Sequence, residues 1–321
     1  MSGRRLAAFV ARRLLALVLL LVLLSFAVYA LMDLAPGSPE QVLLGTRPAK
    51  PELVASLRHQ FHLDLPFLER YGRWLVDAVQ LDLGTSVRSG RTVTAMIGDR
   101  IGVTAFLAGY GFVVAVGVGV PLGIVAAVRR RTTADRAIVG LTVVGVSAPA
   151  FVTGVVLLYL FAVTLGWFPS YGPGSGVADR FWHLTLPALA LALTGLALIT
   201  KITRTAMAEA LEQDYVGFAL ARGVPLREVV VRHALRNALI PILTAAGAVL
   251  TVLLTGTILV ESTFALPGLG SLLVDAVTGK DVPLLQGVVL LLAVVIVVVN
   301  LAIDVLYTRV DPRIAYGRSA A

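Results

Sequence analysis

The sequence predicts an all-α polytopic membrane protein, and three observations support that fold class. Six runs, each about as long as a bilayer is thick, carry no charged side chain, and a spanning helix needs roughly 20 apolar residues. Hydrophobic residues make up 58% of the 321-residue chain and charged residues 14%, which leaves too little polar surface for a soluble globule. Basic residues gather on one side of the runs. Because the bilayer core cannot satisfy backbone polar groups, each run is expected to be helical.

The uncharged runs define six predicted transmembrane helices. The first follows several arginines, as a signal peptide would, but it is longer than a typical apolar signal region. The Leu34-Ala-Pro-Gly segment after it is also a poor cleavage site, so it is expected to remain as the first span. The six runs are Leu14–Met32, Ile101–Val128, Ala137–Leu165, Phe181–Thr200, Asn237–Val260 and Val282–Ile303.

The distribution of arginine and lysine predicts the orientation. Of 27 basic residues, 17 lie before the first span, between the second and third, between the fourth and fifth, and after the sixth. The positive-inside rule therefore places both termini in the cytoplasm, with the chain in the cell (inner) membrane. The connection 33–100 on the other side carries eight bases and eight acids, and long loops cross a membrane largely regardless of charge.

These assignments divide the chain into four parts. Residues 1–32 form a cytoplasmic N-terminus with the first helix, and residues 33–100 form an external segment. Residues 101–308 form the membrane core, within which 201–236 is a long cytoplasmic connection, and residues 309–321 form a cytoplasmic tail.

The external segment is predicted to contain two short amphipathic helices. One is opened by Pro51 and the other by Pro66, and the second places Phe67, Tyr71 and Trp74 on one face. Such helices either lie on the membrane surface and on the helix bundle, or they dock an external partner, and the two interpretations are compatible. Docking predicts contacts at Trp74 and at three residues expected to be exposed, and the full set is Arg70, Arg73, Trp74 and Gln80.

The cytoplasmic connection 201–236 is much longer than two neighbouring spans require. Helix propensity predicts one helix over Glu209–Arg222, and Gly223 is expected to end it in a left-handed conformation. A second helix is predicted over Leu226–Ile240, before Pro241 at the start of the fifth span. This helix–glycine–helix elbow either lies on the membrane surface or receives force from a cytoplasmic partner.

Several motifs, in order along the chain, resemble those of the membrane subunits of dipeptide/oligopeptide/nickel ABC importers. In the cytoplasmic connection they are Asp214-Tyr215-Val216, Ala221-Arg222-Gly223 and Arg232-His233-Ala-Leu-Arg236-Asn237. Elsewhere they include Asp82-Leu-Gly-Thr-Ser86, Glu261, Phe264, Pro267-Gly-Leu-Gly270, Lys280-Asp281 and Asp311-Pro-Arg313. The wider importer family has Glu-Ala-Ala where this chain has Gly217-Phe218-Ala219, a difference that bears on the subfamily more than on the function.

The resemblance implies the transmembrane domain of a type I ABC importer. Its partners would be a homologous second permease subunit, two cytoplasmic ATPase subunits, an external solute-binding protein and the lipid bilayer, with no nucleic acid. ATP and Mg would bind to the ATPases, and this chain would hold no cofactor or metal. Peptide is the first choice of cargo, with nickel or another small solute as the alternative. The implied ATPase-coupling residues are Glu209, Asp214, Tyr215, Phe218, Ala219, Arg222 and Gly223.

Motifs for catalysis and for ion coupling are missing from the sequence. It contains no Gly-x-x-x-x-Gly-Lys-Ser/Thr phosphate loop, no His-Glu-x-x-His, no Gly-x-Ser-x-Gly and no cysteine, so neither an enzyme nor an ATP site is expected. Ion-coupled carriers keep charged groups near mid-membrane, and no predicted span has one at its centre. Two rival functions remain. A proton-coupled secondary transporter would sustain uptake after ATP depletion, and a structural or sensory protein would show no solute flux.

Overall fold

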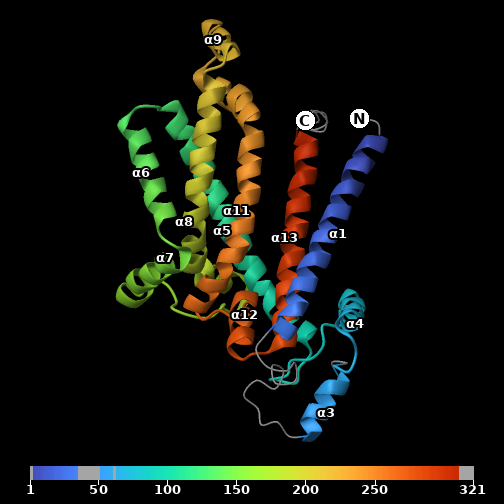
Figure 1. The fold of residues 1–321 in the computed structure, drawn as a ribbon. Helices are drawn as coiled ribbons and strands as arrows, with labels where there is room; N and C mark the ends of the chain where they lie inside the picture. Colours follow the sequence, from blue (N-terminus) through green and yellow to red (C-terminus); the bar gives the residue numbers. More distant parts are fainter. Residues whose placement is uncertain (1–2, 35–50, 61–62, 311–321) are drawn as a thin grey trace. The chain divides into compact units, whose positions relative to one another are not determined.

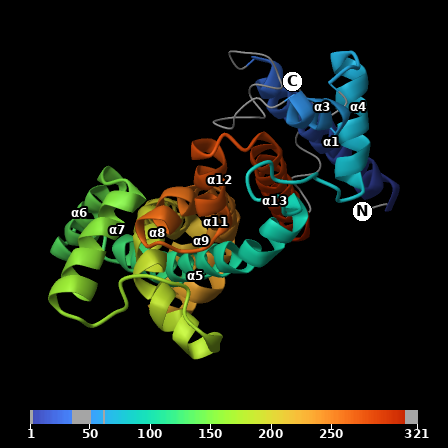
Figure 2. The same cartoon turned by 90° about the horizontal axis from the view of Figure 1, so that it is seen from below.

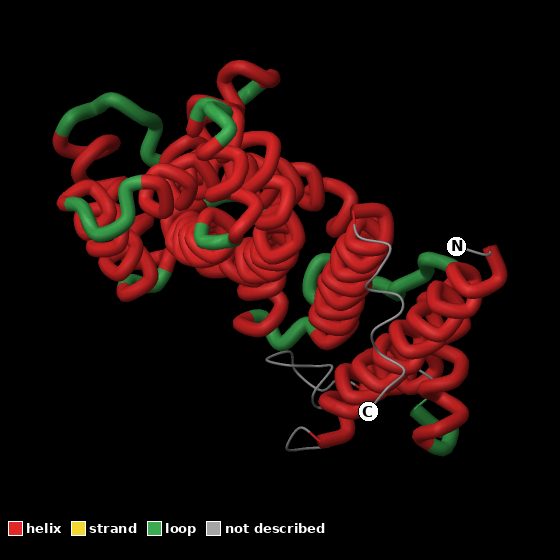
Figure 3. The backbone as a smooth tube through the Cα atoms, turned by 90° about the horizontal axis from the view of Figure 1, so that it is seen from above, coloured by secondary structure: helices red, strands yellow, loops and turns green. Residues whose placement is uncertain are grey.

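Every regular element of the computed structural model is a helix within the part of the chain that it describes, residues 3–34, 51–60 and 63–310 (Figure 3). The predicted all-α class is therefore confirmed. In order, the elements are α1 Gly3–Leu34, α3 Pro51–Gln60, α4 Phe67–Val79, α5 Val93–Val128, α6 Thr133–Ser147, α7 Ala150–Leu157, the π-helix η1 Leu158–Thr164, α8 Gly176–Leu211, α9 Asp214–Ala221, α10 Leu226–Glu228, the π-helix η2 Val229–Ala234, α11 Leu235–Thr263, α12 Leu269–Thr278 and α13 Val282–Val310 (Figure 1).

Four helical stretches among the described residues are long and apolar enough to cross a membrane by themselves. They are Val93–Val128, Gly176–Leu211, Leu226–Thr263 and Val282–Ile303. Helix α1 also covers the whole of the first predicted span, and its described apolar part is Leu14–Ala30. The second, fourth, fifth and sixth predicted spans are thus helical as expected.

The third predicted span, Ala137–Leu165, is not one continuous helix. Helix α6 ends at Ser147 and α7 begins at Ala150. Ala148 between them is extended, with φ −103° and ψ 129°, because the ring of a following proline disfavours the helical conformation. Pro149 thus interrupts an uncharged run that was predicted to be one continuous spanning helix. Both α6 and α7 pack against α8.

Contacts divide the chain into two compact units. The first comprises Met1–Val103 and Pro267–Val298, and the second comprises Thr104–Leu266 and Val299–Ala321. In the first unit, an apolar core joins the start of α5, the helix α12 and the start of α13, and its members are Val93, Ile97, Leu269, Leu272, Ala276, Leu284 and Val288. The buried Asp281 carboxylate accepts a hydrogen bond from the Ser86 hydroxyl and, at 3.3 Å, from the backbone N–H of Val87.

Also in the first unit, α4 packs on α1 through aromatic rings. The ring centroids of Phe26 and Tyr71 lie 5.3 Å apart, as do those of Tyr29 and Trp74, and those of Phe26 and Phe67 lie 5.5 Å apart. The two short helices predicted within residues 33–100 are confirmed as α3 and α4.

In the second unit, α5 and α8 approach closely where α5 carries glycine. A Cβ at Gly123 would lie 2.5 Å from the Cβ of Thr203, and one at Gly119 would lie 2.9 Å from Ile199 Cγ2. The Thr200 hydroxyl donates to the backbone oxygen of Gly119 at 3.2 Å. Glycine at these positions lets the two helix backbones approach closely, and a side chain there would force them further apart.

Candidate functional site

The connection 201–236, predicted to be cytoplasmic, forms a short helix, α9, that lies beyond the end of α8 (Figure 1). The prediction of one helix over Glu209–Arg222 is wrong in one respect, because α8 continues to Leu211 and α9 starts at Asp214. Gln213 between them is extended, with φ −76° and ψ 147°. Glu209 therefore belongs to the last turn of α8, and the other six predicted coupling residues lie on α9 or at its C-terminal end.

Gly223 ends α9 in the left-handed conformation that the sequence predicts, with φ 81°. The N–H of Gly223 donates to Leu220 O at 3.0 Å, and the N–H of Val224 donates to Ala219 O at 3.1 Å. These two bonds are those of a Schellman motif, which satisfies carbonyl groups at the helix end. The chain then turns at Pro225 into α10.

Helix α9 presents an exposed surface that mixes apolar and charged side chains. Phe218 is 71% exposed, and Asp214, Tyr215 and Arg222 are exposed beside it, with Ala219 half-buried. Exposed aromatic and apolar residues on a short projecting helix are typical of a protein-binding surface.

The Tyr215 hydroxyl holds α9 against both neighbouring helices. It donates to the backbone oxygen of Ala210 on α8 at 3.2 Å, and it accepts a hydrogen bond from Asn237 Nδ2 on α11 at 2.6 Å. Sequence reasoning assigned Tyr215 to the surface but gave Asn237 no role. The residue that completes this link lies 22 positions further along the chain.

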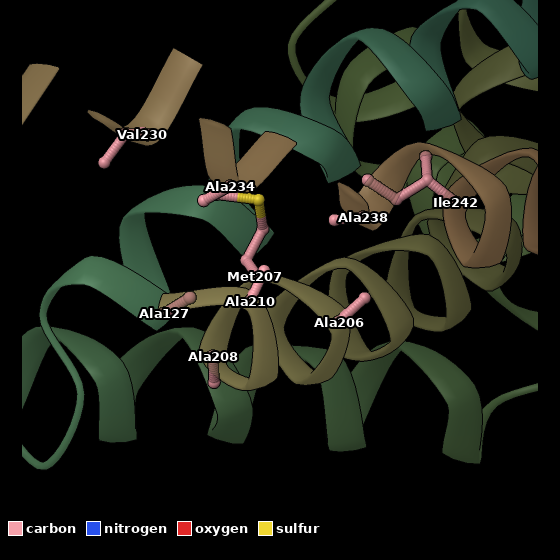
Figure 4. Close-up of a cluster of buried hydrophobic side chains, with 9 residues drawn as sticks. All are labelled: Ala127, Ala206, Met207, Ala208, Ala210, Val230, Ala234, Ala238 and Ile242. Carbon is pink, nitrogen blue, oxygen red and sulfur yellow. The ribbon is translucent and has the colours of Figure 1, made fainter. Parts of the chain in front are cut away.

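The base on which α9 stands is a packed apolar cluster between the end of α5, α8, η2 and α11 (Figure 4). Met207 is fully buried there and points from α8 toward Ala234. The buried members are Ala127, Ala206, Met207, Ala208, Ala210, Val230, Ala234, Ala238 and Ile242. Such close packing leaves this base little freedom to deform.

The return from α9 to the membrane also differs from prediction. The expected helix Leu226–Ile240 begins as α10, passes through the π-helix η2 and continues into α11. The second helix was predicted to end at Ile240, before Pro241 at the start of the fifth span, yet Pro241 lies inside the continuous α11. The π-helical turn of η2 lies immediately before this proline-containing part of α11.

Two ion pairs link the end of α8 to the start of α6 and to the connection that precedes it. Arg204 binds the buried Asp135 with both ends of its guanidinium group, at 2.6 Å from Nε to Oδ1 and 2.9 Å from Nη2 to Oδ2. This hydrogen bond, followed by one from the backbone N–H of Arg131, lowers the pKa of Asp135 to about 2. Arg130 pairs with Glu212, the residue that follows the last residue of α8. The sequence offered no signal for these partners, which are 69 and 82 positions apart.

The four predicted external contact residues do not share one surface. Arg70 was expected to be exposed, but it is 5% exposed, and its guanidinium carbon lies 5.9 Å from the centroid of the Tyr29 ring. Trp74 is half-buried against the same tyrosine. Arg73 and Gln80 are exposed, as predicted.

Among the described residues, no group of three or more His, Asp or Glu side chains is placed to hold a metal ion. The surface of α9, the apolar base beneath it and the apolar helices that continue from it can transmit movement.

Comparison with known families agrees with this geometry. The model of the binding-protein-dependent transport system inner membrane component matches residues 119–316, and the N-terminal model of the same membrane component matches residues 6–108. The chain belongs to the binding-protein-dependent transport system inner membrane components. It is therefore a multi-pass membrane permease of a binding-protein-dependent ABC importer.

Similar proteins match this permease over nearly its whole length. A putative peptide transport system permease protein of Brucella abortus is 38% identical over 92% of this chain and 95% of its own. The glutathione transport system permease protein GsiC of Salmonella paratyphi A is 38% identical over 96% of this chain and 99% of its own. A probable peptide ABC transporter permease protein of Sinorhizobium fredii is 36% identical with the same coverage.

A solved structure shows the same fold. One chain of the MetNI methionine ABC transporter, in an inward-facing conformation, aligns with a TM-score of 0.58 at 18% identity. The alignment covers 67% of this permease and 96% of that chain. The resemblance to an ABC importer membrane subunit is thus confirmed for the fold and for the family.

Proposed function

We propose that this permease moves peptides into the cytoplasm by alternating access, driven by ATP hydrolysis in partner subunits. The observation that carries the proposal is the exposed surface of α9, which Tyr215 fixes to both α8 and α11. Peptide is the proposed cargo because the relatives named above are described as peptide or glutathione permeases. Nickel or another small solute is the alternative, suggested by the wider family.

The proposed assembly contains a homologous second permease, two cytoplasmic ATPases that bind ATP and Mg, and an external solute-binding protein. An ATPase would seat on α9 around Phe218, with Asp214 and Arg222 as charged contacts beside it. Closure of the ATPases would then move α9 as a rigid piece, because Gly223 and Tyr215 fix both of its ends. Glu209 is proposed to contribute from the last turn of α8, at the edge of this surface.

Arg73 and Gln80 are proposed as contacts for the solute-binding protein because both are exposed on α4. Arg70 and Trp74 are left out of that surface, since both side chains lie against Tyr29.

The proposal is tested by uptake of a labelled peptide into proteoliposomes that contain the assembled importer, its binding protein and ATP. Phe218→Ala should reduce ATP-driven uptake at least several-fold while the complex still assembles. Tyr171→Ala is the matched control, because that aromatic side chain is 73% exposed and lies outside the cytoplasmic connection. Full uptake by Phe218→Ala would remove α9 from the coupling role. Uptake that survives ATP depletion and collapses with the proton gradient would instead indicate a secondary transporter.

A further inference from the structure

Helix α4 has three distinct faces, and only one of them packs on protein within the described part of the chain. With 3.6 residues per turn, Phe67, Tyr71, Trp74 and Ala78 fall on one side, where they are buried or in contact with α1, and the buried Arg70 borders that side against Tyr29. A second side is polar, and its members are Glu69, Arg73, Asp77 and Gln80. The third side is apolar, and its members are Leu68, Gly72, Leu75, Val76 and Val79.

The apolar side of α4 is exposed to an unusual degree for an external helix. Leu68 is 71% exposed and Val79 is 78% exposed, with Val76 exposed between them. A row of large apolar side chains in water is unfavourable in proportion to its area. This row lies next to a row of charged side chains on the same helix, as in helices that lie in a membrane interface.

The position of α4 on α1 indicates what covers that side. Helix α4 packs at Ser25, Phe26 and Tyr29, toward the C-terminal end of α1, which the predicted topology places at the outer membrane surface. The Tyr71 hydroxyl lies 2.9 Å from Ser25 Oγ and donates to Val22 O at 3.2 Å. Tyr29 and Trp74, which contact each other closer to the C-terminal end of α1, are of the two residue types enriched at the membrane–water interface.

Two further observations favour lipid over a protein partner. Helix α1, on which α4 packs, itself carries exposed apolar side chains at Leu15, Leu19 and Leu23, as a helix in contact with lipid does. Helix α4 is seen nearly end-on in Figure 1 and lengthwise in Figure 2, whereas α1 runs lengthwise in Figure 1. A helix that crosses a spanning helix lies along the membrane plane.

We infer that α4 is an interfacial helix whose Leu68, Val76 and Val79 side is seated in the outer leaflet of the bilayer. Its polar side then faces water, where Arg73 and Gln80 are accessible. Its aromatic side, locked on Tyr29 and Ser25, fixes the depth of the helix. The occupant of the apolar side is the lipid acyl region, and α4 anchors the external segment to the membrane surface beside the first span.

The absence of cysteine from the sequence allows a direct test. Single variants Leu68→Cys and Val79→Cys probe the apolar side, and Arg73→Cys and Gln80→Cys are matched controls on the polar side of the same helix. Each is labelled with a nitroxide in the assembled importer in lipid nanodiscs. Collision with oxygen, which concentrates in lipid, is compared with collision with a water-soluble nickel chelate.

The inference expects the two apolar positions to favour oxygen and the two polar positions to favour the nickel chelate, with a several-fold difference in their ratios. Brominated phosphatidylcholine should also quench a fluorophore at Val79→Cys more than one at Arg73→Cys. Equal access of the nickel chelate to all four positions would overturn the inference. Protection of Leu68→Cys and Val79→Cys from both reagents would also overturn it, because a protein partner would then cover that side.

Discussion

The guanidinium group of Arg204 on α8 grips the carboxylate of Asp135 on α6 through two parallel hydrogen bonds, of 2.6 and 2.9 Å. Asp135 is buried, and it also accepts a bond of 2.9 Å from the backbone N–H of Arg131. One side chain therefore fixes the turn between α5 and α6 and ties that turn to the helix that leads to α9.

Replacement of the Asp135 carboxylate should weaken the attachment of α6 to α8. Asp135→Asn keeps the size of the side chain but removes its charge, so the free energy of unfolding should fall by roughly 1–3 kcal/mol. Thermal denaturation of the purified permease measures the loss. Glu69→Gln is the control, since Glu69 pairs with Arg73 at 2.9 Å on an exposed helix surface, where such pairs contribute below about 1 kcal/mol. Equal losses in the two variants would contradict the structural role of Asp135.

The same pair predicts a defined response to acid. Hydrogen bonding to Arg204 lowers the pKa of Asp135 from 3.8 to about 2 on folding, so its contribution to stability is complete above the higher value and is lost as the pH falls through the lower one. The difference in melting temperature between the wild type and Asp135→Asn should therefore be equal at about pH 5 and about pH 7 and should shrink below about pH 4. A difference that already shrinks between pH 7 and pH 5 would show that the carboxylate is not held in this way.

The crossing of α5 and α8 predicts different effects for glycines of the same helix. Gly123→Ala would place a Cβ 2.5 Å from Thr203 and 2.8 Å from Thr200 O, so the helices must move apart at a cost of about 1–3 kcal/mol. Gly117→Ala has open space at its Cβ, and it should be neutral or slightly stabilising because alanine favours helix. Melting temperatures of the two variants decide the matter, and similar values would contradict the close approach.

Position 223 has room for a side chain, but its left-handed backbone conformation is unfavourable for most residues other than glycine. No atom lies within 4 Å of a Cβ built there, yet its φ of 81° is strained for other residues, so Gly223→Val should cost about 1–2 kcal/mol locally. Membrane insertion should be unchanged while ATP-driven uptake falls. Gly223→Asn should retain more uptake because asparagine accepts the left-handed conformation. The control Gly217→Ala, which also has open space, should transport normally, and a Gly223→Val variant with normal uptake would argue against a coupling role for this turn.

Charge and hydrophobic periodicity can be read from a short stretch of sequence, so the structural elements that depend on them alone were predictable. The uncharged runs identified the long helices, proline and aromatic spacing identified α3 and α4, and Gly223 was assigned its left-handed conformation. The errors arose where the outcome depended on a partner or on a single interruption. Pro149 broke an uncharged run, and Pro241 was absorbed into α11. Arg70 was predicted to be exposed because nothing in the sequence shows that its side of α4 would meet Tyr29.

Helix α8 combines two tasks through its length. At 1.5 Å per residue, its 36 residues extend about 54 Å, whereas the hydrocarbon core of a bilayer is about 30 Å thick. Close to half of this helix therefore stands outside the hydrocarbon, and no loop separates its membrane portion from the turn that carries α9. Pro187, which lacks a backbone N–H, is the one proline inside α8, and no proline follows it as far as Leu211. In the proposed coupling, the stretch after Pro187 acts as a lever arm that carries a thrust from the aqueous compartment toward the membrane interior.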